Sequence, residues 1–103
     1  MNDEKYVELC EGVYYKSVSK TLLHCSEKIT LSESEVHLID FLYKNPNQKL
    51  TAIDIFNHIH FNSPEKEFSS DSIKSLVKRL RKKTYPEIII YHSNLGYSLN
   101  FPS

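Results

Sequence analysis

Glycine is scarce in this sequence of 103 residues, and tryptophan is absent. The two glycines are too few for the glycine-rich loop that cradles the phosphates of a nucleotide. The motifs GxSxG and HExxH do not occur, and no pair of active-site carboxylates can be recognised. We therefore expect neither enzymatic activity nor a bound cofactor.

Cysteine occurs only twice, as Cys10 and Cys25. Both lie in apolar, strand-like segments without a CxxC spacing, so we expect small buried hydrophobic residues in a reducing compartment. Of the five histidines, His58 and His60 are two apart on an expected helix and point in different directions. The sequence thus predicts no disulfide and no metal site.

Long hydrophobic runs are missing as well. No stretch approaches the roughly 20 apolar residues that span a bilayer, and the N-terminus lacks the pattern of a signal peptide. Hydrophobic residues make up 40% of the chain and charged residues 25%, which is ordinary for a globular protein. We expect one cytoplasmic domain over residues 1–103, loose at 1–5 and 102–103, with no membrane contact.

The net charge is zero, but the charges are unevenly distributed. Residues 1–71 hold seven basic and twelve acidic side chains, whereas residues 72–103 hold six basic and one acidic. All six of those basic residues fall between Lys74 and Lys83. Such clustering is typical of one anion-binding face, although the solvated face of a helix can produce it too.

The first third of the chain favours β-structure. Short runs of β-branched and aromatic residues, separated by polar turns, predict four strands in a meander. The expected strands are 6–10, 13–15, 21–24 and 28–31.

Three helices are expected next. Ser32 and Glu35 form a capping box, and the helix that they begin ends near Lys44, before Pro46. Thr51 caps a second, shorter helix, which is followed by a polar loop over 61–68. A third helix is predicted from a cap at Ser69 or Ser70 to Thr84. Strands at 88–91 and 97–101, joined by an Asn- and Gly-containing turn, complete the chain as a hairpin.

The third helix holds the residues that can bind an anionic partner. Its apolar residues recur at i, i+3, i+4 and i+7, at Ile73, Leu76, Val77 and Leu80, and form a core stripe. The opposite face is almost entirely cationic, and short serines there permit close approach to a partner. A helix of this width fits the major groove of DNA, where Arg and Lys bind phosphates or guanine. Two helices before it and a hairpin after it are the parts of a winged helix-turn-helix.

Three stretches resemble the winged-helix effector domain of OmpR/PhoB-type response regulators. Residues 29–39 resemble I-x-L-T-x-x-E-x-x-L-L, with Glu35 at the acidic position. Residues 72–83 resemble T-V-D-V-H-I-x-R-L-R-x-K, and residues 90–97 resemble x-T-V-R-G-x-G-Y. The resemblance extends from Tyr6 to Phe101. It implies an α+β winged helix-turn-helix fold with an N-terminal four-stranded antiparallel sheet, three helices and a C-terminal β-hairpin wing.

The resemblance also implies a function, namely sequence-specific binding of double-stranded DNA by the output domain of a two-component transcription regulator. It implies that Lys78, Arg79 and Arg81 reach DNA, with Arg79 contacting a base, and that Tyr97 donates its hydroxyl to a phosphate. Together with the residues beside them, the candidate DNA-binding set is Ser72, Lys74, Ser75, Lys78, Arg79, Arg81, Lys82, His92, Ser93, Asn94 and Tyr97.

Two partner interactions are implied in the same way. Domains of this family bind direct repeats as head-to-tail dimers, which predicts a weak homodimer on DNA. Their loop between the second and third helices can touch RNA polymerase, which gives the 61–68 loop a role. A plain connector is an equally good interpretation of this loop.

Several residues depart from the family pattern. Lys74 replaces an acid and Leu76 replaces a histidine, while His60 stands where a tryptophan often closes the second helix. In the wing, Ser93 and Asn94 replace an Arg-Gly pair. We expect a weaker or different wing contact, with His92 or Asn94 as substitutes, and a base preference that differs from that of relatives. The alternative is a winged-helix protein-interaction module with lost or weak DNA binding.

Overall fold

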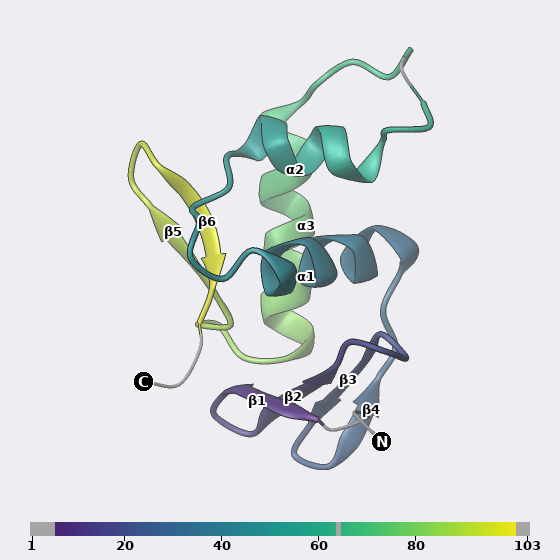
Figure 1. Ribbon diagram of the computed structural model, residues 1–103, viewed down its shortest axis with the longest axis vertical. Helices are drawn as coiled ribbons and strands as arrows, with labels where there is room; N and C mark the ends of the chain where they lie inside the picture. The colour runs from purple at the N-terminus through teal and green to yellow at the C-terminus, as the bar shows by residue number, and fades with distance from the viewer. Residues whose placement is uncertain (1–5, 64, 101–103) are drawn as a thin grey trace.

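The fold is seen in a computed structural model that describes residues 6–63 and 65–100. A sheet lies at one end of the molecule, α1 and α2 cross α3 in the middle, and a hairpin runs beside α3 (Figure 1). The loose ends expected at 1–5 and 102–103, Pro64 of the loop and strand position Phe101 lie outside the described residues. Over the described residues, no helix has both the length and the apolar character that crossing a membrane requires.

The N-terminal sheet is the expected antiparallel meander, in the order β1-β2-β3-β4. Its buried residues include Tyr15 and Leu22, which are directly paired across β2 and β3. The fourth strand is shorter than expected and begins earlier, at Glu27 rather than Lys28. The strands are β1 (Val7–Cys10), β2 (Val13–Lys16), β3 (Thr21–His24) and β4 (Glu27–Ile29).

Cys25 corrects the expectation that both cysteines are buried: it is exposed, whereas Cys10 is half-buried. Cys25 and Ser26 form the turn between β3 and β4 with φ of 54° and 71°. A two-residue hairpin turn of the type that matches strand twist needs positive φ at both positions. Neither residue is Gly or Asn, so nothing in the sequence indicated that the side chain of Cys25 lies in an exposed turn.

The three helices begin where their caps predict. In α1 (Glu33–Lys44), Ser32 accepts from the Glu35 amide and its own amide donates to Glu35, at 3.2 and 2.8 Å. In α2 (Ala52–Ile59), Thr51 and Asp54 form a second capping box. In α3 (Ser70–Lys83), the cap is Ser69, whose hydroxyl accepts from the Ser72 amide at 3.3 Å. These caps satisfy backbone amides that the first helical turn leaves without partners.

The hairpin consists of β5 (Ile89–His92) and β6 (Gly96–Leu99). The connection between α1 and α2 pairs with strand β6 of this hairpin. Leu50 and Tyr97 exchange both backbone hydrogen bonds, at 2.9 and 2.7 Å. The hairpin is therefore fixed to the start of α2 as well as to α3.

One continuous core joins the helices, the N-terminal sheet and the hairpin. The stripe expected on α3 is confirmed, since Ile73, Leu76, Val77 and Leu80 are all buried. The antiparallel four-stranded sheet, the three helices and the terminal hairpin confirm the expected fold class. The other buried hydrophobic residues are Leu9, Val13, Tyr15, Leu22, Leu38, Ile39, Leu42, Leu50, Ile55, Phe56, Ile88, Ile89, Tyr97 and Leu99.

Candidate nucleic-acid interface

The outer face of α3 and the adjoining hairpin gather the residues predicted to bind DNA. The structure leaves most of them at the surface, half-buries two and buries one. Exposed are Ser72, Lys74, Ser75, Lys78, Arg79, Lys82, Ser93 and Asn94; half-buried are Arg81 and His92; buried is Tyr97.

Three lysines of α3 have exposed side chains directed away from the core: Lys74, Lys78 and Lys82. Among the described residues, none of the three has a hydrogen bond or ion pair with another side chain. Their spacing of four residues keeps them on one side of the helix, about 6 Å apart in rise from one to the next. They form a row of exposed positive charges along one side of the helix.

Arg79 and Arg81 differ from these lysines because each has a partner within the chain. The Nε atom of Arg79 lies 3.7 Å from a carboxylate oxygen of Glu35 on α1. Arg81 donates from Nη2 to the backbone oxygen of Ile89 at 2.8 Å, which joins α3 to β5. Replacing these arginines would therefore change packing as well as surface charge.

A cavity of about 270 Å³ lies between α3 and the hairpin. Its cationic side is formed by Lys74 and Arg81, whose buried Nε atom has no hydrogen-bond partner among the described residues. Its aromatic side is formed by Tyr91 and Tyr97, whose ring centroids are 5.1 Å apart. Burial raises the pKa of Tyr97, and the proximity of Tyr91 raises it further. The hydroxyl of Tyr97 is therefore a neutral proton donor near neutral pH.

The tip of the hairpin is small and lacks cations. Asn94 has a φ of 63°, a conformation that Asn tolerates, and the Leu95 amide donates to the His92 oxygen at 2.9 Å. The ring of His92 is 2.8 Å from the hydroxyl of Ser98, which restrains it along the hairpin. Leu95 projects from the tip with 57% of its surface exposed. Hydrogen bonding and apolar contact are thus the means by which this tip can meet a partner.

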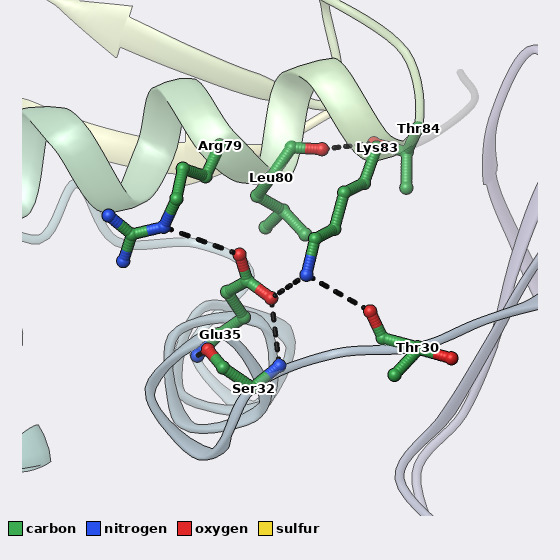
Figure 2. Close-up of polar contacts among 7 residues, drawn as sticks. All are labelled: Thr30, Ser32, Glu35, Arg79, Leu80, Lys83 and Thr84. Atoms are coloured by element: carbon green, nitrogen blue, oxygen red, sulfur yellow. Dashed lines mark hydrogen bonds and ion pairs between the residues drawn. The ribbon is translucent and has the colours of Figure 1, made fainter.

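Glu35 is the buried centre that orients α3 (Figure 2). Only 1% of its surface is exposed, and Oε1 accepts from the Ser32 amide and from Lys83 at 2.8 and 2.6 Å. The same Lys83 donates to the oxygen of Thr30 at 3.0 Å. A residue predicted only to cap α1 therefore also holds the C-terminal half of α3 through Arg79 and Lys83. One signal in the sequence could have revealed these contacts. A buried carboxylate needs cationic partners, and α3 holds nearly all the cations of the second half of the chain.

Asp40 plays a similar part between α1 and the N-terminal sheet. It is 6% exposed and accepts from the Tyr15 hydroxyl at 2.7 Å and from Lys44 at 2.8 Å. Burial by itself raises the pKa of both Glu35 and Asp40. The hydrogen bonds and charges around each carboxyl together outweigh burial, so each has a pKa below its usual value. They come from Lys83 and Ser32 at Glu35, and from Lys44, Tyr15 and Lys20 at Asp40.

These lowered pKa values predict how stability depends on pH. Because both carboxyls bind protons more weakly in the folded state, their contribution is complete above pH about 4 to 5 and is lost as pH falls through their folded values. Glu35→Gln should lower the free energy of unfolding at pH 7 by about 1 to 2 kcal/mol, since the charged partners of Glu35 are partly solvated. Denaturant unfolding from pH 7 to pH 3 measures both effects.

The variant should also lose less stability than the wild type over that pH range, because one of the two linked carboxyls is gone. Glu33→Gln is the matched control, since Glu33 is exposed on the same first turn of α1. An equal pH dependence for all three proteins would show that the Glu35 contacts do not contribute to stability.

His58 and His60 have aromatic neighbours. The ring of His58 stacks on Phe41 with centroids 4.0 Å apart, and that of His60 lies 4.5 Å from Phe56. Within residues 6–63 and 65–100, no group of three or more His, Cys, Asp or Glu side chains could hold a metal ion.

Comparison with known proteins identifies the family of this chain. The family model described as "Transcriptional regulatory protein, C terminal" matches residues 26–99. None of the curated proteins matches the sequence. The domain pattern expected from the resemblance to response regulators is thus confirmed at the level of the family.

Three solved structures are similar in fold. The DNA-binding domain of the response regulator AdeR, in complex with an intercistronic region, is 20% identical with a TM-score of 0.71, over 92% of this chain and 100% of that one. The Klebsiella pneumoniae RstA DNA-binding domain in complex with the RstA box is 16% identical with a TM-score of 0.68, over 92% and 96%. DrrB, an OmpR/PhoB homologue from Thermotoga maritima, is 18% identical with a TM-score of 0.75 over 92% of this chain, which spans 44% of its length. These likenesses establish the winged-helix fold.

Proposed function

Because the chain belongs to the family of C-terminal domains of transcriptional regulatory proteins, we propose that it binds double-stranded DNA in a sequence-specific manner, with α3 in the major groove. The observation that carries this proposal is the exposed lysine row of α3 beside a hairpin fixed to the same helix. Lysines without internal partners can neutralise phosphates without losing contacts that the fold needs.

The individual roles follow from the placement of each side chain. Lys74, Lys78 and Lys82 contact phosphates or base edges directly, and Ser72 and Ser75 allow the helix to approach the groove. To contact a base, Arg79 has to break its ion pair with Glu35, in which Nε lies 3.7 Å from the carboxylate oxygen. Arg81 holds the wing, so its role in DNA binding is to position rather than to read.

The wing contributes the remaining contacts. Tyr97, with a neutral hydroxyl, donates to a phosphate from the wall of the cavity that it shares with Arg81. His92, Ser93 and Asn94 take the place of the family's Arg-Gly pair at the hairpin tip. Their hydrogen-bonding groups suit the acceptors of the minor groove, although they bring no permanent charge.

Two protein interactions complete the proposal. On the basis of the family resemblance, two copies bind a direct repeat head to tail, each holding its half-site weakly. RNA polymerase contacts the 61–68 loop, in which Phe61 is 71% exposed. Phe68, at the other end of the loop, instead packs edge-on against Phe56 with centroids 5.4 Å apart. Phe61 is therefore the aromatic residue of this loop that is available to contact RNA polymerase.

A second function is favoured by one observation, the cation-free wing with its exposed Leu95. In this alternative the domain is a protein-interaction module with lost or weak DNA binding. The two functions differ in whether the chain distinguishes one DNA sequence from another.

Selection from a pool of random duplexes tests the proposed function. The protein is mixed with the pool at low and at moderate salt, bound duplexes are separated by mobility shift, and the recovered sequences are read. We expect enrichment of one motif and tighter binding to two direct copies of it than to one copy. Weak binding without any enriched motif would instead support the protein-interaction module.

A further inference from the structure

Asp71 is the acidic residue of α3, and it stands at the DNA-facing end of the helix. Ser69 is the cap, so Asp71 is the second helical residue, and its side chain is exposed. Helical spacing of i, i+4, i+7 and i+11 places Asp71, Ser75, Lys78 and Lys82 on one line opposite the buried stripe. A carboxylate therefore heads the outermost row of the proposed reading helix.

This carboxylate has no side-chain partner that would account for its position. Among the described residues, no hydrogen bond or ion pair joins the Asp71 side chain to another group, whereas Glu35 and Asp40 are both held by cations. Asp71 does favour the positive end of the helix dipole, as acids in a first turn do. That interaction is weak for an exposed side chain, and it leaves the carboxylate oxygens free to accept from a partner.

On a helix that approaches DNA, an outward carboxylate is repelled by phosphates unless it meets a donor. The exocyclic amino groups of cytosine and adenine are the donors that the major groove presents. Residues near the N-terminus of a recognition helix are those that reach base edges. Asp71 lies in this region, and Lys78 lies two turns further along the same line, about 10.5 Å away in rise.

We propose that Asp71 is a specificity-determining residue that selects cytosine by accepting a hydrogen bond from its N4 amino group. This inference rests on the proposed function and deepens it. Ser75, one turn further along the row, can donate to an acceptor of the neighbouring guanine or thymine, because a hydroxyl serves either base. The row thus combines an acceptor, a hydroxyl and lysine donors, and reads a mixed sequence rather than a run of guanines.

The test compares the motifs selected from a random duplex pool by the wild type, Asp71→Ala, Asp71→Asn and Glu27→Ala. Glu27→Ala is the matched control, because it removes one exposed negative charge from β4, outside α3. For the wild type we expect one motif position at which cytosine is preferred over the other bases by roughly tenfold. Asp71→Ala should lose the preference at that position alone, and Glu27→Ala should keep it.

Asp71→Asn sharpens the test, since asparagine pairs with the N6 and N7 atoms of adenine. This variant keeps the shape of the side chain and should change the preference at the same position from cytosine to adenine. Thermal unfolding of each variant establishes that it is folded. A change confined to one motif position cannot arise from a general loss of stability or charge.

Two outcomes would overturn the inference, and they are distinguishable. If the wild type enriches a motif and Asp71→Ala enriches the same motif, Asp71 serves only the helix dipole or the net charge. If the wild type enriches no motif, the proposed function fails and the inference fails with it.

Discussion

Gly96→Ala should be the most destabilising single substitution in the wing, lowering the free energy of unfolding by about 3 kcal/mol or more. A Cβ atom at this position would lie 2.5 Å from the Leu50 oxygen and 2.9 Å from the Thr51 amide nitrogen. The φ of Gly96 is +129°, which side chains rarely adopt. Relief requires the hairpin to move away from the connection between α1 and α2, with loss of both Leu50–Tyr97 hydrogen bonds.

Thermal unfolding followed by circular dichroism measures this effect, and a fall in Tm of roughly 10 to 20 °C corresponds to it. Gly12→Ala is the matched control. Gly12 also has a positive φ, of 77°, but its added Cβ would be 3.7 Å from the Cys25 sulfur, an ordinary contact. The control should therefore lose only about 1 kcal/mol, from backbone strain. Equal losses in the two variants would mean that the close approach to Leu50 does not constrain the wing.

Replacing Lys74 and Lys78 together by alanine should weaken DNA binding by at least about 100-fold at moderate salt while leaving Tm nearly unchanged. Both side chains are exposed, and neither has a partner in the described part of the chain. If the wild type neutralises four to six phosphates, log affinity should fall against log salt with a slope of roughly −4 to −5. Loss of two phosphate contacts should reduce that slope by about 1.8.

Fluorescence anisotropy titrations of a selected duplex at several salt concentrations give both the affinity and the slope. The matched control is the pair Lys28→Ala and Lys66→Ala, which removes two exposed lysines that lie outside α3. It should change affinity by less than the experimental pair and leave the slope nearly unaltered. Similar losses for both pairs would indicate that net charge, rather than the face of α3, governs binding.

The helices and the hairpin could be predicted because their determinants are local. Ser32, Thr51 and Ser69 identify the three helix starts through hydrogen bonds spanning only three residues, and the structure has all three. The apolar spacing of α3 predicts its buried face in the same way. Such features need no knowledge of what lies elsewhere in the chain.

Contacts between distant segments could not be predicted in this way. Arg79 and Lys83 were recognised as cations on α3, but their approach to Glu35 depends on how α1 crosses α3. The bond from Arg81 to Ile89 likewise depends on where the hairpin returns. The exposure of Cys25 was missed because the positive φ of this turn is borne by residues that ordinarily avoid it. Sequence thus identified the charges of the candidate site, while packing determined which of them remain available to a partner.

The backbone bridge between Leu50 and Tyr97 limits how this domain can be recombined with its relatives. A wing transplanted from another protein would not be an independent cassette, because one of its strands is paired with the segment before α2. An exchange that keeps the pairing must carry the α1–α2 connection together with the hairpin, or match it at Leu50 and Gly96. Lengthening that connection by even one residue would shift the alternation of its side chains against β6. The unit of modular exchange in this domain is therefore larger than the hairpin that the sequence outlines.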